Sequence, residues 1–192
     1  GGRMKENVER CGGIAAMVED PWGTAVDLGK VEAAFTAHPR ARILAFVHAE
    51  TSTGAQSDAQ ALADIAHRHG ALVIADTVTS LGGTPVKVDD WGLDAVYSGS
   101  QKCLSCAPGL SPVSFGERAV ARIKSRRHKV QSWFLDLNLV MGYWGSGQRR
   151  AYHHTAPVNA LYGLHEALLI LREEGLAHAW SRPRRNHLAL RA

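Results

Sequence analysis

Apolar and polar positions along the chain form two successive units, each a helical stretch followed by a short apolar run. In the first unit, Val31 and Phe35 recur at the spacing of one helix face. Asp27 is the expected N-cap of this helix, which should end near His38. The apolar run 43–48 follows. Continuous apolar runs are typical of parallel strands buried on both faces, so this run predicts such a strand.

The second unit repeats this order. A helix should begin at Ser57 or Asp58 and end at Gly70, because serine and aspartate favour N-caps and glycine favours helix ends. The run 71–75 then predicts another buried strand, which closes at Asp76.

Further strands are predicted at 94–98 and 113–115, and the chain should open with a helix over 3–11 and a short strand over 14–18. Alternating strands and helices predict a mostly parallel, doubly wound α/β sheet. With no internal repeat or linker in sight, we expect one domain.

From Glu117 onward the pattern changes. A basic helix is followed by a long aromatic connection and then by a strongly amphipathic helix over about 157–174. The aromatic residues of the connection are Trp133, Phe134, Tyr143, Trp144 and Tyr152.

The composition is that of a globular protein, with 192 residues, 45% hydrophobic and 21% charged. Disorder is therefore excluded as a description of the whole chain. No uncharged apolar run approaches the roughly 18 residues of a membrane-spanning helix, and the first residues contain no apolar signal region, so we expect no membrane anchor.

The formal net charge of +4 comes mostly from basic residues in 118–129, 149–150 and 182–191. A nucleic-acid-binding stripe would also need interleaved aromatic residues or a known reading motif, and neither accompanies these runs, so no nucleic-acid partner is expected. The odd number of cysteines, three, argues against a disulfide framework and predicts a reducing, cytoplasmic location.

Candidate chemistry lies where the predicted strands end, since ligands of open α/β sheets bind beyond the carboxyl ends of the strands. Asp76 follows one strand and Lys102 follows the next. Taken singly, Asp76 could be a helix cap and Lys102 a solvated loop residue. Together at one sheet edge, they could hold a flat, charged cofactor.

Pyridoxal phosphate is the cofactor that needs this pair. A primary amine forms an exchangeable imine with its aldehyde, which arginine cannot do, and a carboxylate keeps its ring nitrogen protonated so that the ring accepts electrons.

Four segments resemble the class V aminotransferases. They are Ser-Gly-Ser-Gln-Lys-Cys-Leu-Ser-Cys-Ala-Pro-Gly over 98–109, Asp-Thr-Val-Thr-Ser-Leu-Gly-Gly-Thr-Pro over 76–85, His-Ala-Glu-Thr-Ser-Thr-Gly over 48–54 and Tyr-His-His-Thr-Ala-Pro over 152–157. The alanine:glyoxylate (serine:pyruvate) aminotransferase group is the most similar. The resemblance implies fold type I, a pyridoxal phosphate cofactor and transamination of a small amino acid, alanine or serine, with glyoxylate or pyruvate.

The resemblance also implies roles for individual residues. Lys102 would be the Schiff-base lysine and proton shuttle, and Asp76 the partner of the pyridine nitrogen. Val78 would pack under one ring face, and Thr51 would hydrogen-bond near the ring hydroxyl. Without the resemblance, Val78 could equally be a core valine and Thr51 a turn threonine.

The remaining implied roles concern the cofactor phosphate. Gln101 would meet it within the chain, while Tyr152 and Thr155 would reach the phosphate of the neighbouring subunit, which implies a homodimer with shared active sites. Considered alone, Tyr152 could be a buried tyrosine and Thr155 a helix N-cap ahead of Pro157.

Two other motifs carry no predicted chemistry. His153 and His154 are expected to point to opposite faces of a strand, with no further ligand spaced to complete a metal site. Cys103 and Cys106 have CxxC spacing but lack a thioredoxin-like setting.

In the family, a phosphate-binding glycine turn and a ring-stacking aromatic precede the part that this chain resembles, and a small domain with the substrate-carboxylate arginine follows it. We therefore expect residues 1–192 to be the central part of the cofactor-binding large domain. Two alternatives stay open: a ureidoglycine:glyoxylate aminotransferase or a lyase of the same class, and a non-catalytic fragment that only dimerises.

Overall fold

The computed structural model describes residues 1–144 and 151–191. One sheet has the strand order β1 (Ile43–Val47), β2 (Leu72–Asp76), β3 (Ala95–Tyr97) and β4 (Val113–Phe115). The first three strands are parallel and β4 is antiparallel to β3. The predicted mostly parallel α/β sheet is confirmed.

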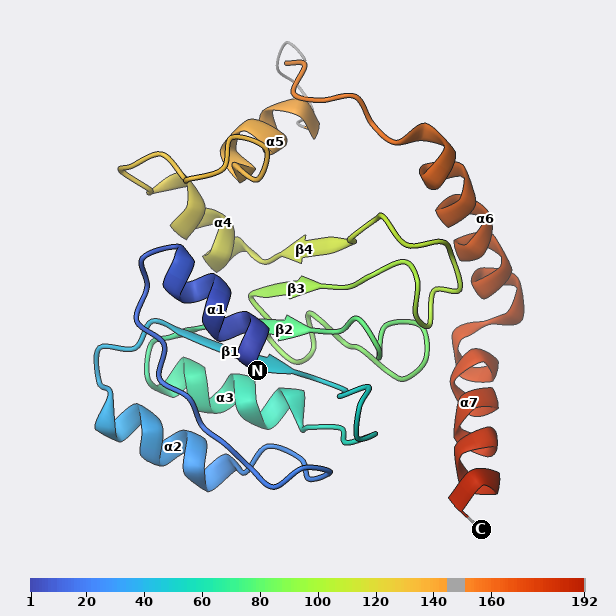
Figure 1. The fold of residues 1–192 in the computed structure, drawn as a ribbon, viewed down its shortest axis with the longest axis horizontal. Helices are drawn as coiled ribbons and strands as arrows, with labels where there is room; N and C mark the ends of the chain where they lie inside the picture. The colour runs from blue at the N-terminus through green and yellow to red at the C-terminus, as the bar shows by residue number, and fades with distance from the viewer. Residues whose placement is uncertain (145–150, 192) are drawn as a thin grey trace.

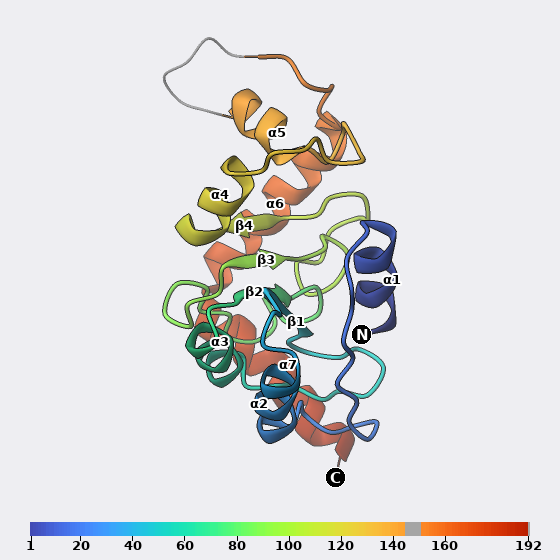
Figure 2. The same cartoon turned by 90° about the vertical axis from the view of Figure 1, so that its left-hand side faces the viewer.

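The helices surround this sheet (Figure 1). Turning the molecule shows α3 on one face of the sheet and α1 on the other, while α6 and α7 run along the side to which β1, β2 and β3 point (Figures 1 and 2). The helices are α1 (Gly2–Arg10), α2 (Leu28–Ala37), α3 (Ala59–Arg68), α4 (Glu117–Lys124), α5 (Leu137–Trp144), α6 (Val158–Glu174) and α7 (Leu176–Arg191). None of the described helices is long and apolar enough to cross a bilayer.

The N-caps of the two predicted core helices are confirmed. Asp27 accepts a hydrogen bond from Lys30 N at 3.1 Å, and Asp58 accepts one from Ala61 N at 2.9 Å. Such caps stabilise a helix by about 1 kcal/mol each. Gly70, with φ of 69°, turns the chain after α3 into β2 in a left-handed conformation that glycine adopts without steric cost.

The core lies between α2, α3 and the sheet. Val31 and Phe35 of α2 are buried there together with Leu62 of α3 and Val73 of β2. The apolar face predicted for the helix after Asp27 is thus the one that packs, whereas α6, predicted to be strongly amphipathic, has no buried residue in the described structure.

Three expectations about the elements are wrong. The stretch 14–18 forms no strand and Ile14 is fully exposed, because a strand needs a hydrogen-bonded neighbour and this stretch pairs with none of the described residues. β1 is parallel to β2 as expected but is not buried on both faces, since of its five residues only Phe46 is buried and Ile43 is 54% exposed. The aromatic connection contains α5, with Val140 buried, where no helix was predicted.

Candidate active site

The carboxyl ends of β1, β2 and β3 meet at one edge of the sheet. In the register of these strands, Val47 lies opposite Asp76, and Asp76 lies opposite Tyr97. The segments 48–54, 76–80 and 98–102 therefore leave the sheet side by side (Figure 1).

Asp76 is the last residue of β2, and both of its carboxylate oxygens are held. Oδ1 accepts a hydrogen bond from Val78 N at 2.9 Å, and Oδ2 accepts one from the Tyr97 hydroxyl at 2.7 Å. A turn, not a helix, follows at 78–80, so the reading of Asp76 as a helix cap is wrong. Since a carboxylate has about four acceptor positions, this one can accept a further donor.

Side-chain hydrogen bonds join the three strand ends. The Thr51 hydroxyl hydrogen-bonds with the Thr79 hydroxyl, which connects the first end to the second. The Cys103 thiol donates a hydrogen bond to the Thr79 carbonyl at 2.9 Å, which connects the third strand end to the second. Burial raises the pKa of the Cys103 thiol, and the opposing positive charges of Lys102 and Arg182 are weaker influences, so this thiol is suited to its role as a donor.

Lys102 and Gln101 are exposed at the third strand end. Within the described ranges, the Lys102 side chain has no hydrogen bond or ion pair, which leaves its amine available to a ligand. A Cβ on Gly99 would lie 2.7 Å from Gln101 Oε1 and 3.4 Å from Val78 Cγ1. The glycine thus lets the Gln101 amide approach the backbone beside Val78.

Tyr152 and Thr155 lie in a different place. Their hydroxyls are 2.6 Å apart, Tyr152 is 73% exposed, and its ring meets that of Tyr143 edge-on. Both views place this segment beyond β4 and α5, away from the carboxyl ends of β1 to β3 (Figures 1 and 2). Neither alternative reading holds: Tyr152 is not buried, and α6 begins after Pro157 without a side-chain cap.

His153 and His154 do not point to opposite faces. Their Nδ1 atoms lie 2.8 Å apart, and the His153 ring stacks on Trp133. The expectation failed because this segment is not a strand. Among the described residues, no group of three or more histidine, cysteine or acidic side chains is arranged to hold a metal ion.

The sequence reading missed two residues that shape this edge. Tyr97 holds Asp76 as described, and its position at a strand end in register with Asp76 is the signal that could have revealed it. His48 is buried, with Nδ1 at 2.9 Å from Ser80 Oγ and Nε2 at 3.2 Å from Gln56 Nε2. Burial lowers the pKa of His48, which favours a neutral imidazole as a structural link between the loops.

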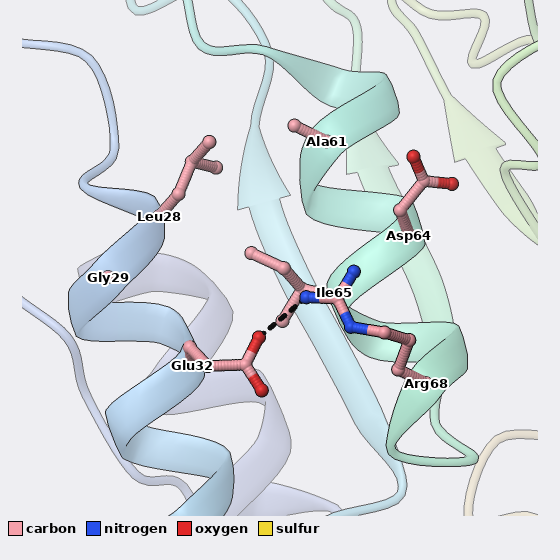
Figure 3. Close-up of a pocket in the computed structure, with 7 residues that line it drawn as sticks. All are labelled: Leu28, Gly29, Glu32, Ala61, Asp64, Ile65 and Arg68. Carbon is pink, nitrogen blue, oxygen red and sulfur yellow. Dashed lines mark hydrogen bonds and ion pairs between the residues drawn. The ribbon is translucent and has the colours of Figure 1, made fainter.

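A surface hollow between α2 and α3 contains none of the candidate residues (Figure 3). Glu32 and Arg68 form an ion pair across it at 2.7 Å. Its lining is completed by Leu28, Gly29, Ala61, Asp64 and Ile65. The candidate site is instead the open edge at the strand ends.

A mostly parallel sheet with helices on both faces is the α/β architecture of the fold type I transferases (Figure 2). The chain matches the family described as aminotransferase class-V over residues 12–191, and it belongs to that family.

Relatives and solved structures agree with this assignment. The chain is 39% identical over 186 residues to the alanine–glyoxylate aminotransferase of Oryctolagus cuniculus, covering 96% of this chain and 47% of that protein. The crystal structure of an alanine–glyoxylate aminotransferase from Nostoc sp. superposes with a TM-score of 0.93 at 44% identity, covering 98% of this chain and 49% of that one.

A second kind of relative is also similar. The (S)-ureidoglycine–glyoxylate transaminase of Bacillus subtilis is 35% identical over 208 residues, covering 98% of this chain and 49% of that protein. The crystal structure of the ureidoglycine-glyoxylate aminotransferase from the same organism has a TM-score of 0.92 at 36% identity, covering 98% of this chain and 48% of that one. The chain spans about half the length of the curated relatives it matches.

Proposed function

We propose that the complete protein containing this chain is a pyridoxal-phosphate-dependent aminotransferase that moves the amino group of alanine or serine to glyoxylate or pyruvate. The observation that carries the proposal is the pair at one sheet edge: a Lys102 amine without a partner among the described residues and an Asp76 carboxylate held by two hydrogen bonds. The likeness to alanine–glyoxylate aminotransferases supports the choice of substrates.

The side chains at this edge fit the chemical groups of the cofactor. The carboxylate of Asp76 has acceptor positions left for a ring N–H, and the Lys102 amine, which has no partner in the described part of the chain, can reach a carbonyl carbon of a ligand. Val78 presents an apolar side chain for a ring face. Because Gly99 has no side chain, the Gln101 amide can lie close to Val78. When bound, pyridoxal phosphate supplies an electrophilic carbon and a ring that accepts electrons from the substrate.

Each residue then has a defined task. Lys102 would hold the cofactor through its amine, and the same amine, when free, would take a proton from the substrate carbon. Asp76 holds the proton on the ring nitrogen. Thr51, fixed by Thr79, orients the ring hydroxyl, and Gln101 binds the phosphate.

A second candidate is transamination of ureidoglycine with glyoxylate. It is favoured by the 35% identity to a Bacillus subtilis transaminase named for that substrate. The two candidates share the residues of the described edge and differ in the amino donor, so an assay of donors separates them.

The test is to add pyridoxal phosphate to the complete protein and to reduce it with borohydride. We expect a new long-wavelength absorption band that reduction removes, and a cofactor label on Lys102 in the peptide map. Alanine, serine and ureidoglycine are then offered with glyoxylate or pyruvate. A label on another lysine, such as the exposed Lys87, would contradict the assignment, and absence of any band would support the non-catalytic alternative.

We also propose that the protein acts as a homodimer in which Tyr152 and Thr155 complete the partner's site. The separation of this segment from the strand ends within one chain supports the proposal (Figures 1 and 2). In a symmetric dimer, the segment of each chain would lie at the strand ends of the other chain. The dimer would then have two equivalent sites.

Subunit mixing tests this arrangement. One inactive variant carries Lys102→Ala and the other carries Tyr152→Phe with Thr155→Ala. In the hybrid dimer one site combines the intact lysine with the intact hydroxyl pair, so an equal mixture should recover about a quarter of the unmodified activity. No recovery, in a mixture shown by mass to contain the hybrid, would mean that the hydroxyl pair acts within its own chain.

Location is the remaining proposal. Cys11, Cys103 and Cys106 are all free, as a reducing compartment permits, which supports a cytoplasmic protein.

A further inference from the structure

Tyr97 makes a direct contact with the Asp76 carboxylate, and the roles proposed so far do not use it. The two residues are Cα partners in the β2–β3 pairing, at the carboxyl ends of both strands. The Tyr97 hydroxyl donates to Asp76 Oδ2 at 2.7 Å. Hydrogen bonds to an ionised acceptor are shorter and about twice as strong as neutral ones.

The contact restricts how the carboxylate can turn. An aspartate side chain has two rotatable bonds, and a single hydrogen bond to Oδ1 from Val78 N would still let the group pivot. The Tyr97 hydroxyl holds the other oxygen from the neighbouring strand. Both oxygens are therefore placed before any ligand arrives.

The hydroxyl is suited to remain a donor. Burial raises the pKa of Tyr97, and the hydrogen bond to Asp76 and the negative charge of that carboxylate raise it further. The phenol consequently stays protonated throughout the neutral and mildly alkaline range, in which an aminotransferase would work.

Resting on the proposed function, we infer that Tyr97 is a positioning residue: its hydroxyl holds the Asp76 carboxylate in the orientation that keeps the cofactor's ring nitrogen protonated. The residue touches neither the substrate nor the reacting carbon in this role. It acts only through Asp76.

The test is Tyr97→Phe in the complete protein, loaded with pyridoxal phosphate labelled with ¹⁵N at the ring nitrogen. The ¹⁵N chemical shift reports whether that nitrogen carries a proton. We expect the variant to fold and to carry the cofactor label on Lys102 after borohydride reduction. The cofactor should dissociate about three- to tenfold more readily, and the nitrogen should lose its proton at a pH up to about one unit lower.

Thr77→Val is the matched control. Its buried hydroxyl donates to the Tyr97 carbonyl at 3.0 Å, so the substitution removes a hydrogen bond between the same two strands without touching Asp76. The melting temperature should fall, while the cofactor affinity and the ¹⁵N titration should stay as in the unmodified protein.

Two results would overturn the inference while leaving the proposed function in place. One is a Tyr97→Phe protein whose ¹⁵N titration and cofactor affinity equal those of the unmodified protein. The other is a Thr77→Val protein with the same shifts as Tyr97→Phe, which would show that strand packing alone is responsible. Failure of the unmodified protein to label Lys102 would instead overturn the proposed function, and the inference with it.

Discussion

Lys102→Ala in the complete protein should abolish amino-group transfer and leave the fold intact. The side chain is exposed at a strand end and has no hydrogen bond or ion pair within the described residues, so its removal costs little stability. The loss of both the covalent attachment and the proton transfer should lower kcat by a factor on the order of 10⁴ or more. Initial rates of pyruvate formation from alanine and glyoxylate measure this, with the melting temperature as the check on folding.

Two further variants separate the chemistry from the charge. Lys102→Arg keeps a positive charge but cannot form the imine, so it should be as inactive as the alanine variant. Lys87→Ala removes an exposed lysine that forms an ion pair with Asp90 and should keep full activity. Substantial residual activity in Lys102→Arg would show that the lysine contributes charge rather than a covalent bond.

Asp76→Asn should bind the cofactor and still turn over slowly, with kcat lower by about 10²- to 10³-fold, the usual effect of removing one preorganised electrostatic contact. The amide resembles the carboxylate in shape, so its oxygen can still accept the hydrogen bond from Val78 N. The amide has no negative charge, however, to keep a ring nitrogen protonated. Single-turnover rates separate this slow chemical step from weaker cofactor binding. Asp64→Asn, on the exposed face of α3, is the matched control and should be unaffected.

A cofactor methylated at its ring nitrogen gives this prediction a second readout, because its positive charge does not depend on a proton. Asp76→Ala, which leaves room for the methyl group, should recover part of its activity with this analogue relative to ordinary pyridoxal phosphate. Equal activity with both cofactors would mean that Asp76 does not act through the ring charge.

Much of the fold could be predicted from the sequence because helix caps and apolar faces depend on interactions among residues only a few positions apart. The caps at Asp27 and Asp58 depend on a carboxylate and the backbone N–H three residues later. The apolar spacing of Val31 and Phe35 marks the face that α2 buries, whatever packs on it. The strand ends at Asp76 and Lys102 followed from such runs together with the family resemblance, and the structure places both residues at the expected edge.

The sequence patterns failed for elements whose formation depends on packing or pairing with residues far away in the chain. The apolar stretch 14–18 has the composition of a strand but pairs with no strand in the described chain, whereas α5 forms within a segment read only as aromatic. Strand pairing and helix packing are supplied by residues far away in the chain, so a local pattern cannot decide between these outcomes.

The sequence determined the caps at Asp27 and Asp58 and the buried face of α2, and together with the family resemblance it marked the lysine and the aspartate of the candidate site. Only the tertiary structure showed that the Tyr97 hydroxyl reaches Asp76, 21 residues away, and that Thr51 meets Thr79. It also showed that the segment 151–157 lies apart from the strand ends of its own chain (Figures 1 and 2). These relations depend on strand register and on the path of long connections, which join residues too far apart in sequence for any local preference to bring together.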